Sequence, residues 1–198
     1  MHAYFPLRPG AAWRYRLTQG AQPPTESTER VLGLRQVDGG VCAEVEQTSS
    51  FSELAAARYE YVLGPRGLLP ALWSMSTSAG EVRARCASGL FLPIDVAPGR
   101  RWTYEVTFDM PQQHLRIRAA MEAVAMVQVE VPAGIFGALL VRQELRTESQ
   151  ISASGLNLPS TAQLQRDELY FAPGVGLVRA IGCAGSSVLK ELVSYEID

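Results

Sequence analysis

The strongest constraint on the fold is a pattern that the chain carries twice. Residues 4–17 read YFPLRPGAAWRYRL, and residues 91–106 read FLPIDVAPGRRWTYEV. In both, two residues separate a Pro-Gly pair from the Trp-x-Tyr that follows it. Pro-Gly favours a tight turn, because Pro restricts φ and Gly tolerates a positive φ. Side chains two apart in a strand share a face, so each copy predicts a turn that leads into a strand with Trp and Tyr on one face.

A second pair of segments follows the first pair. Residues 61–69 (YVLGPRGLL) match residues 170–178 (YFAPGVGLV), with Tyr six positions before Gly-Leu in each. This spacing predicts one domain, residues 1–198, made of two β repeats at about 4–88 and 91–198. Each repeat is expected to be an antiparallel meander of about five strands.

Period-two alternation predicts strands through most of the chain. Residues 115–131 are rich in Ala and Met, but their odd positions are all apolar and many even positions are charged or polar, which favours a strand or two strands joined by a bulge over a helix. Phe136–Arg146 is expected to be its hairpin partner. Loops are expected at Gly20–Thr28, at Ser74–Gly80, and at Ser152–Thr161, where Leu156 and Leu158 are apolar.

These patterns predict an all-β fold. The duplicated antiparallel meanders are expected to form one large curved sheet or half-barrel, with a β-sandwich as the alternative. The 17 Gly and 12 Pro are spread along the chain, as in proteins with many short strands and turns.

Composition limits the partners. The chain of 198 residues is 47% hydrophobic and 19% charged, with a net charge of −2, so it can form a core and lacks the clustered cations that nucleic acid requires. No apolar run reaches the length of a transmembrane segment. Lys190 is the only lysine, and we attribute the excess of arginine to codon usage in a GC-rich genome rather than to anion recognition.

The sequence leaves open the compartment of the protein and the disulfide state of its cysteines. The first motif begins at Tyr4, which leaves no room for a signal peptide and predicts a cytoplasmic protein if Met1 is the native start. If an export signal was removed, a cell-envelope or periplasmic location is expected. Cys42, Cys86 and Cys183 have neither zinc nor disulfide-framework spacing, so we expect buried free thiols, with one long-range disulfide as the alternative in an exported protein.

No catalytic or metal constellation stands out, and no cofactor is expected. Gly174-Val-Gly176 lacks the third glycine of a dinucleotide fingerprint. The only histidines are His2 and His114, too few for a metal cluster or a credible Cys–His pair. An enzyme would require a cleft that brings together Arg100, Arg101, Glu105 and His114.

Three motifs together resemble a family of uncharacterised bacterial proteins. They are YFPLRPGAAWRYRL, VEVPAGIFGALLVRQE at residues 129–144, and LYFAPGVGLVRAIG at residues 169–182. Members are mostly domains of unknown function, often lipoproteins or exported proteins. The resemblance implies a fold similar to the curved sheets of lipoprotein carriers and receptors, a cell-envelope bias, and no catalytic residues.

The leading functional hypothesis is a non-catalytic binding module of the bacterial cell envelope. Its curved sheet would hold a lipid-like or other hydrophobic ligand, with Trp13, Tyr15, Trp102 and Tyr104 as the ligand-contacting residues. The first role expected for these four aromatics is to anchor the core, because aromatic side chains bury the most area; ligand contact is the second. The alternative is a structural or protein-interaction domain that binds another envelope protein.

Overall fold

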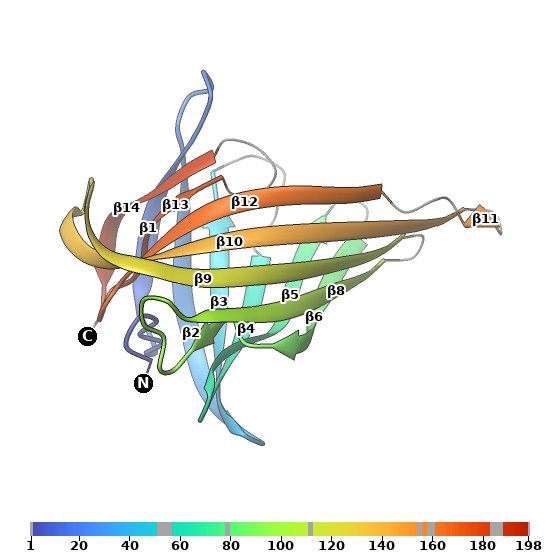
Figure 1. Cartoon of the computed structure of the whole chain (residues 1–198), viewed down its shortest axis with the longest axis horizontal. Helices are drawn as coiled ribbons and strands as arrows, with labels where there is room; N and C mark the ends of the chain where they lie inside the picture. Colours follow the sequence, from blue (N-terminus) through green and yellow to red (C-terminus); the bar gives the residue numbers. More distant parts are fainter. Residues whose placement is uncertain are drawn as a thin grey trace.

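The computed structural model describes residues 2–50, 57–77, 80–110, 113–153, 156–157, 161–182 and 188–197. Twelve strands form one antiparallel sheet in chain order, and the sheet closes because β14 pairs with β1 and β10 pairs with β9 (Figure 1). They are β1 (Ala12–Gln19), β2 (Thr25–Val37), β3 (Gly40–Ser49), β4 (Ala57–Gly64), β5 (Gly67–Thr77), β6 (Gly80–Gly89), β8 (Arg101–Met110), β9 (Gln113–Val131), β10 (Gly134–Ala153), β12 (Thr161–Ala172), β13 (Gly176–Ile181) and β14 (Val188–Glu196).

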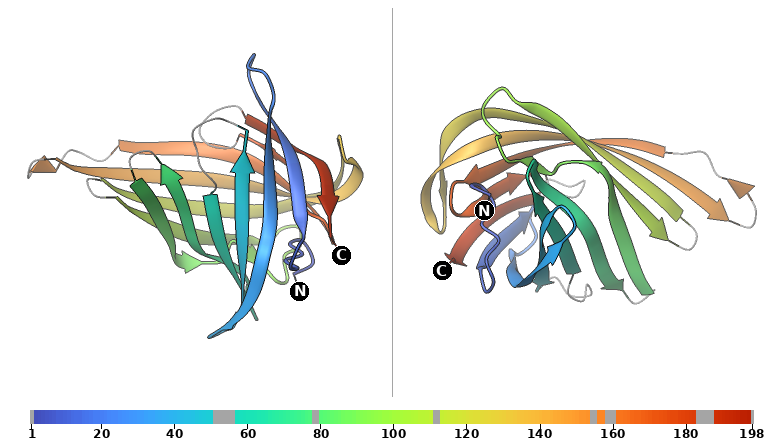
Figure 2. Two further views of the ribbon diagram at one scale, coloured as in Figure 1. Left: turned by 180° about the vertical axis from the view of Figure 1, so that it is seen from behind. Right: turned by 90° about the horizontal axis from the view of Figure 1, so that it is seen from below.

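Two short strands lie outside this ring. β7 (Leu92–Pro93) pairs with β5, and β11 (Leu156–Asn157) pairs with β10. The termini lie close together, as the pairing of β1 with β14 requires (Figure 2).

The predicted all-β fold with one large curved sheet is confirmed, and the curvature goes further than a half-barrel. The described strands belong to a single sheet, so the β-sandwich alternative is not adopted. Closure gives the first and last strands a partner, which removes two edges that would otherwise expose unpaired backbone groups.

The expected long strand and its hairpin partner are also confirmed. β9 is continuous over 19 residues, and the register shift opposite Leu140 and Val141 leaves Val124 as the extra residue of a bulge. Several loop boundaries were wrong, since β2 already begins at Thr25, β5 continues to Thr77 and β10 continues to Ala153. Ser and Thr at these places continue the hydrogen-bonded ladder, which polar composition alone does not reveal. Leu158 lies outside the described residues.

The two faces of the sheet differ in chemistry. Alternate side chains point inward and form one apolar core that includes Tyr15, Leu139 and Phe171. The outward side chains form ion pairs between neighbouring strands, for example Arg101 with Glu122 at 2.8 Å and Arg179 with Glu191 at 2.7 Å. This segregation follows directly from the period-two pattern of the strands.

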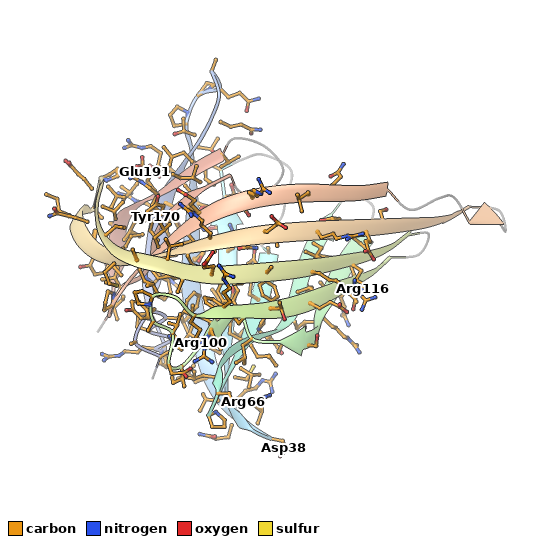
Figure 3. The ribbon with its side chains drawn as sticks, in the orientation of Figure 1. Asp38, Arg66, Arg100, Arg116, Tyr170 and Glu191 are labelled. Carbon is orange, nitrogen blue, oxygen red and sulfur yellow. The ribbon has the colours of Figure 1, made fainter. Side chains whose placement is uncertain are left out.

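The up-and-down order places alternate turns at the same end of the closed sheet. Asp38, Arg66 and Arg100 mark the β2–β3 turn, the β4–β5 turn and the segment before β8, and they lie at the end where the chain begins (Figure 3). We call this the N-terminal end. The opposite end, which we call the far end, carries the β1–β2 turn and the last residues of β3, β5, β8, β10 and β13.

The repeated motifs occupy equivalent places in the ring. β8 lies six strands from β1, and the β12–β13 turn lies six strands from the β4–β5 turn. Each of the two predicted repeats, residues 4–88 and 91–198, contributes six strands to the ring rather than the expected five. The Pro-Gly turns are alike as well, since Gly10 and Gly99 have φ values of 85° and 88°. The duplication itself stays a prediction.

Candidate functional site

The N-terminal end of the closed sheet is plugged by two aromatic side chains. Phe91 contacts the rings of Tyr61 and Phe171, which belong to strands on different parts of the ring, at centroid distances of 6.2 Å each. Phe5 packs against Tyr61 at 5.2 Å and against Phe91 at 6.2 Å. Because Phe91 bridges opposite walls, it fills the interior at this end.

Backbone hydrogen bonds hold this plug in place. Phe91 N donates to Leu68 O at 2.8 Å, and Ile94 N donates to Arg66 O at 2.9 Å. The His2 ring bonds through Nε2 to Pro93 O at 2.9 Å. The close approach requires Gly67, since a Cβ there would lie 2.4 Å from the Leu92 carbonyl oxygen.

An apolar cavity of about 260 Å³ lies inside the sheet next to this plug. Phe91, Tyr61 and Tyr104 bound it on the plug side, and Val106, Phe108 and Ile117 extend its wall toward the far end. Its remaining lining residues are Tyr59, Glu60, Pro70, Leu72, Ala84 and Leu145. Apolar walls with a few hydroxyl groups are typical of sites for hydrophobic ligands.

A polar group of side chains faces the interior from β14, β1 and β2. Lys190 Nζ lies 2.5 Å from Glu29 Oε1, and its ammonium sits 4.0 Å from the centroid of the Tyr15 ring. Only 13% of the Lys190 side chain and 21% of the Glu29 side chain are exposed. The sole lysine of the chain therefore points into the sheet rather than to its charged outer face.

A second polar group faces the interior from β8, β10 and β12. Gln143 Nε2 donates to the Tyr104 hydroxyl at 3.3 Å, and Gln165 Nε2 donates to Asp167 Oδ1 at 2.7 Å. Gln143 and Asp167 are neighbours in register and both are buried. Burial raises the pKa of the Asp167 carboxyl above its usual range.

Trp13 and Tyr15, two of the predicted ligand contacts, are packed in the core. They are 5% and 2% exposed, and a space of about 10 Å³ lies between them and Phe5. The Trp13 indole donates to Val175 O at 2.6 Å, and the Tyr15 hydroxyl donates to Leu177 O at 3.1 Å. Burial also raises the pKa of Tyr15 well above its usual range, so the phenol stays neutral.

Trp102 and Tyr104, the other two, lie in more open places. Both are half-buried, and the Trp102 indole donates to Phe91 O at 3.1 Å. Tyr104 lines the interior cavity, whereas Trp102 borders a groove formed mostly by outward side chains. The structure does not bring the four aromatics into one cavity, and their contact with a ligand remains a prediction.

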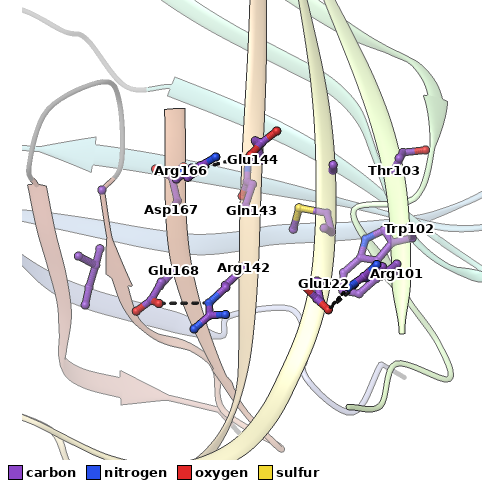
Figure 4. A pocket seen from close by; sticks show the side chains of 14 residues that line it. Arg101, Trp102, Thr103, Glu122, Arg142, Gln143, Glu144, Arg166, Asp167 and Glu168 are labelled. Carbon is purple, nitrogen blue, oxygen red and sulfur yellow. Dashed lines mark hydrogen bonds and ion pairs between the residues drawn. The ribbon is translucent and has the colours of Figure 1, made fainter. Parts of the chain in front are cut away.

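The outer groove crosses β8, β9, β10 and β12 and has a volume of about 730 Å³ (Figure 4). Ion pairs line its sides: Arg101 with Glu122 at 2.8 Å, Arg166 with Glu144 at 3.1 Å and Arg142 with Glu168 at 3.5 Å. Each of these cations is matched by an anion on the next strand, so the groove carries little unpaired charge for a ligand to exploit.

The residues considered for an enzyme cleft do not share a pocket in the described part of the chain. Arg100 pairs with Asp95, Arg101 lines the outer groove, and Glu105 pairs with Arg116 and Arg118. The His114 side chain lies outside the described residues. Cys42 is a buried free cysteine, whereas the Cys86 side chain and Cys183 lie outside the description.

Among the described residues, no three His, Cys, Asp or Glu side chains lie together as possible metal ligands. No described helix is long and apolar enough to cross a membrane.

Sequence reasoning missed the residues that shape the interior. The repeated pattern marks Phe5 and Phe91 only as motif positions, although an aromatic residue within two positions of a proline and before a turn is a usable signal for an end plug. The sequence marks Lys190 only by its rarity, and no pattern marks Glu29. Their pairing joins positions 161 residues apart, which no local pattern indicates.

The comparisons with known proteins agree on the fold. No protein-family model and no curated protein matches the chain. It is similar to the crystal structure of a candidate exported protein with a YmcC-like fold from Bacteroides fragilis, with a TM-score of 0.60 and 13% identity over 99% of this chain and 100% of the other. A candidate lipoprotein from Parabacteroides distasonis gives a TM-score of 0.58 and 12% identity over 98% and 99% of the two chains. At these identities, the likeness concerns the fold.

Proposed function

We propose that this chain is a non-catalytic binding module of the bacterial cell envelope that holds a hydrophobic or lipid-like ligand in its interior. The observation that carries the proposal is the apolar cavity of about 260 Å³ between the Phe91 plug and the far end. The cavity is close to the lower limit of ligand pockets, about 300 Å³, so it suits one acyl chain or a small apolar molecule.

Two observations support the placement of the ligand inside rather than outside. Half-buried apolar side chains, among them Val106 and Ile117, lie opposite each other on β8 and β9 along the inner wall. A ligand there would cover apolar surface, which is favourable at about 25 cal/mol per Å². In the outer groove, three arginines are already paired with carboxylates on neighbouring strands, so these ion pairs leave no unpaired charge for a ligand.

The envelope location draws support from the two structural neighbours. One is a candidate exported protein and the other a candidate lipoprotein, and both cover nearly the whole chain. An export route for this chain is therefore part of the proposal. The test is the genomic reading frame upstream of Met1, where the proposal requires an export signal.

The cavity is tested by filling it. In Val106→Trp, an indole occupies the space next to Tyr104, and we expect the loss of the acyl ligands that the wild-type chain retains in native mass spectrometry after incubation with a lipid extract. Thr103→Trp, an exposed position on the outer face of the same strand, is the matched control. Loss of ligand in the control but not in Val106→Trp would place the site in the outer groove and overturn the proposal.

A further inference from the structure

The interior contains a charged pair that the apolar cavity does not explain. Lys190 and Glu29 are held 2.5 Å apart with most of their surface covered, and the ammonium lies over the Tyr15 ring. A covered ion pair loses hydration that its mutual attraction barely restores. Since every other basic residue of the chain apart from the two histidines is arginine and many pair on the outer face, this pair has a distinct setting.

A buried hydroxyl next to this pair has no hydrogen-bond partner. Ser27 is 2% exposed and lies opposite Tyr15 in register, so its side chain shares the inner face of β2 with Glu29 two residues on. Its Oγ finds no partner among the described residues. Buried hydroxyl groups nearly always have a partner, so the Ser27 Oγ is free to pair with a polar group of a bound molecule.

The polar group continues to the apolar cavity. Gln47 on β3 is the register neighbour of Glu29, and its Oε1 accepts a hydrogen bond of 2.5 Å from the Tyr59 hydroxyl. Tyr59 lines the cavity. One run of polar inner-wall residues, which we call the polar belt (Lys190, Glu29, Ser27, Gln47 and Tyr59), thus leads from the charged pair to the apolar space.

The charge of the belt restricts what it can recognise. The charges of Lys190 and Glu29 cancel each other. A ligand carboxylate in the polar belt is therefore repelled by Glu29, and a ligand ammonium is repelled by Lys190. An uncharged group with hydroxyls can hydrogen-bond to three side chains of the polar belt. It can donate to the Glu29 carboxylate, accept from the Lys190 ammonium and pair with the Ser27 hydroxyl.

We propose that the interior ligand is a single-chain amphiphile with an uncharged, hydroxyl-bearing head group, such as a monoacylglycerol, whose head lies at the polar belt and whose chain fills the cavity. This inference rests on the proposed function, because it requires the cavity to hold an acyl chain.

The experiment compares monolaurin with laurate, which have the same chain and differ in the head group. Binding to the full chain is measured at pH 8 by isothermal titration calorimetry. We expect monolaurin to bind about tenfold more tightly than laurate, and Ser27→Ala to weaken monolaurin by up to about tenfold, the effect of one hydrogen bond.

A charge change provides the sharper readout. In Glu29→Gln the belt gains a net positive charge, so laurate is expected to bind more tightly than monolaurin, an inversion that a purely structural role of Glu29 does not produce. Glu144→Gln on the outer face, whose carboxylate pairs with Arg166, is the matched control and should leave the preference unchanged.

The outcomes separate the two proposals. Equal binding of the two ligands, insensitive to Ser27→Ala and Glu29→Gln, would overturn the head-group assignment and leave the binding function standing. Failure of both ligands to bind, in calorimetry and in native mass spectrometry, would overturn the binding function itself.

Discussion

The two Trp-x-Tyr strands share one motif and have different surroundings. On β1, Trp13 and Tyr15 are almost completely buried, with about 10 Å³ of free space beside them. On β8, six strands away, Trp102 and Tyr104 are half-buried, and each borders a larger space. The motif therefore determines a strand and a face, and the neighbouring segments determine whether that face is covered.

The cover differs because the two tryptophans bond to different segments. The Trp13 indole donates to Val175, in the turn between β12 and β13, so the strand is locked to a part of the chain 162 residues away. The Trp102 indole donates to Phe91, only 11 residues back in the same segment. Trp13 is buried beside this distant segment, whereas Tyr104 on the inner face of β8 borders the cavity.

We expect Trp13 to contribute more to stability than Trp102. Trp13→Ala leaves a large hole in a packed core and should lower the free energy of unfolding by about 3–5 kcal/mol, the usual cost of deleting a buried tryptophan. Trp102→Ala removes a half-covered side chain and should cost about 1–2 kcal/mol. Urea denaturation followed by circular dichroism measures both. Equal losses would mean that the two strands are energetically equivalent.

A pH titration sharpens the contrast at the plugged end. Burial lowers the pKa of His2 from its usual value of about 6.5. Its Nδ1 accepts from the Tyr4 backbone N–H at 3.2 Å, and Nε2 faces Pro93 O, so the bound form is the neutral ring. The unfolded chain then binds more protons, and stability should be full above about pH 6.5 and should fall as the pH drops below that value.

The check is urea denaturation at pH 7.5 and pH 5.5. Wild type should lose more stability on acidification than His2→Gln, whose amide keeps a donor and an acceptor but does not titrate. The raised pKa of Asp167 acts in the opposite sense, because it favours the folded state as the pH falls, and it is present in both proteins. If His2→Gln showed the same pH dependence of stability as wild type, the titration of His2 would not be the cause of the loss of stability at low pH.

The ion pairs on the outer face are expected to contribute little to stability. Arg101→Gln removes the pair with Glu122, but the Arg101 side chain is 77% exposed. Exposed pairs contribute at most about 1 kcal/mol, so the midpoint of urea unfolding should barely change. A loss as large as that of Trp102→Ala would show that the ion-pair rows, rather than the inner aromatics, hold β8 in the sheet.

The turns, the strands and the face on which each side chain lies could be predicted from local sequence patterns. Pro98-Gly99 predicts a turn and the alternation from Leu115 to Val131 predicts a strand, because turn residues and period two act over a few neighbouring residues. The all-β curved sheet follows from these local rules.

How far the sheet curves and where its interior is filled depend on contacts between distant parts of the chain. Closure joins β14 to β1 across almost the whole chain, the Phe91 plug bridges opposite walls, and Lys190 meets Glu29 from 161 residues away. Such contacts depend on the cumulative twist and stagger of twelve strands, which no single segment encodes. For that reason Trp13 and Trp102, alike in sequence, became a sealed core residue and a half-buried one.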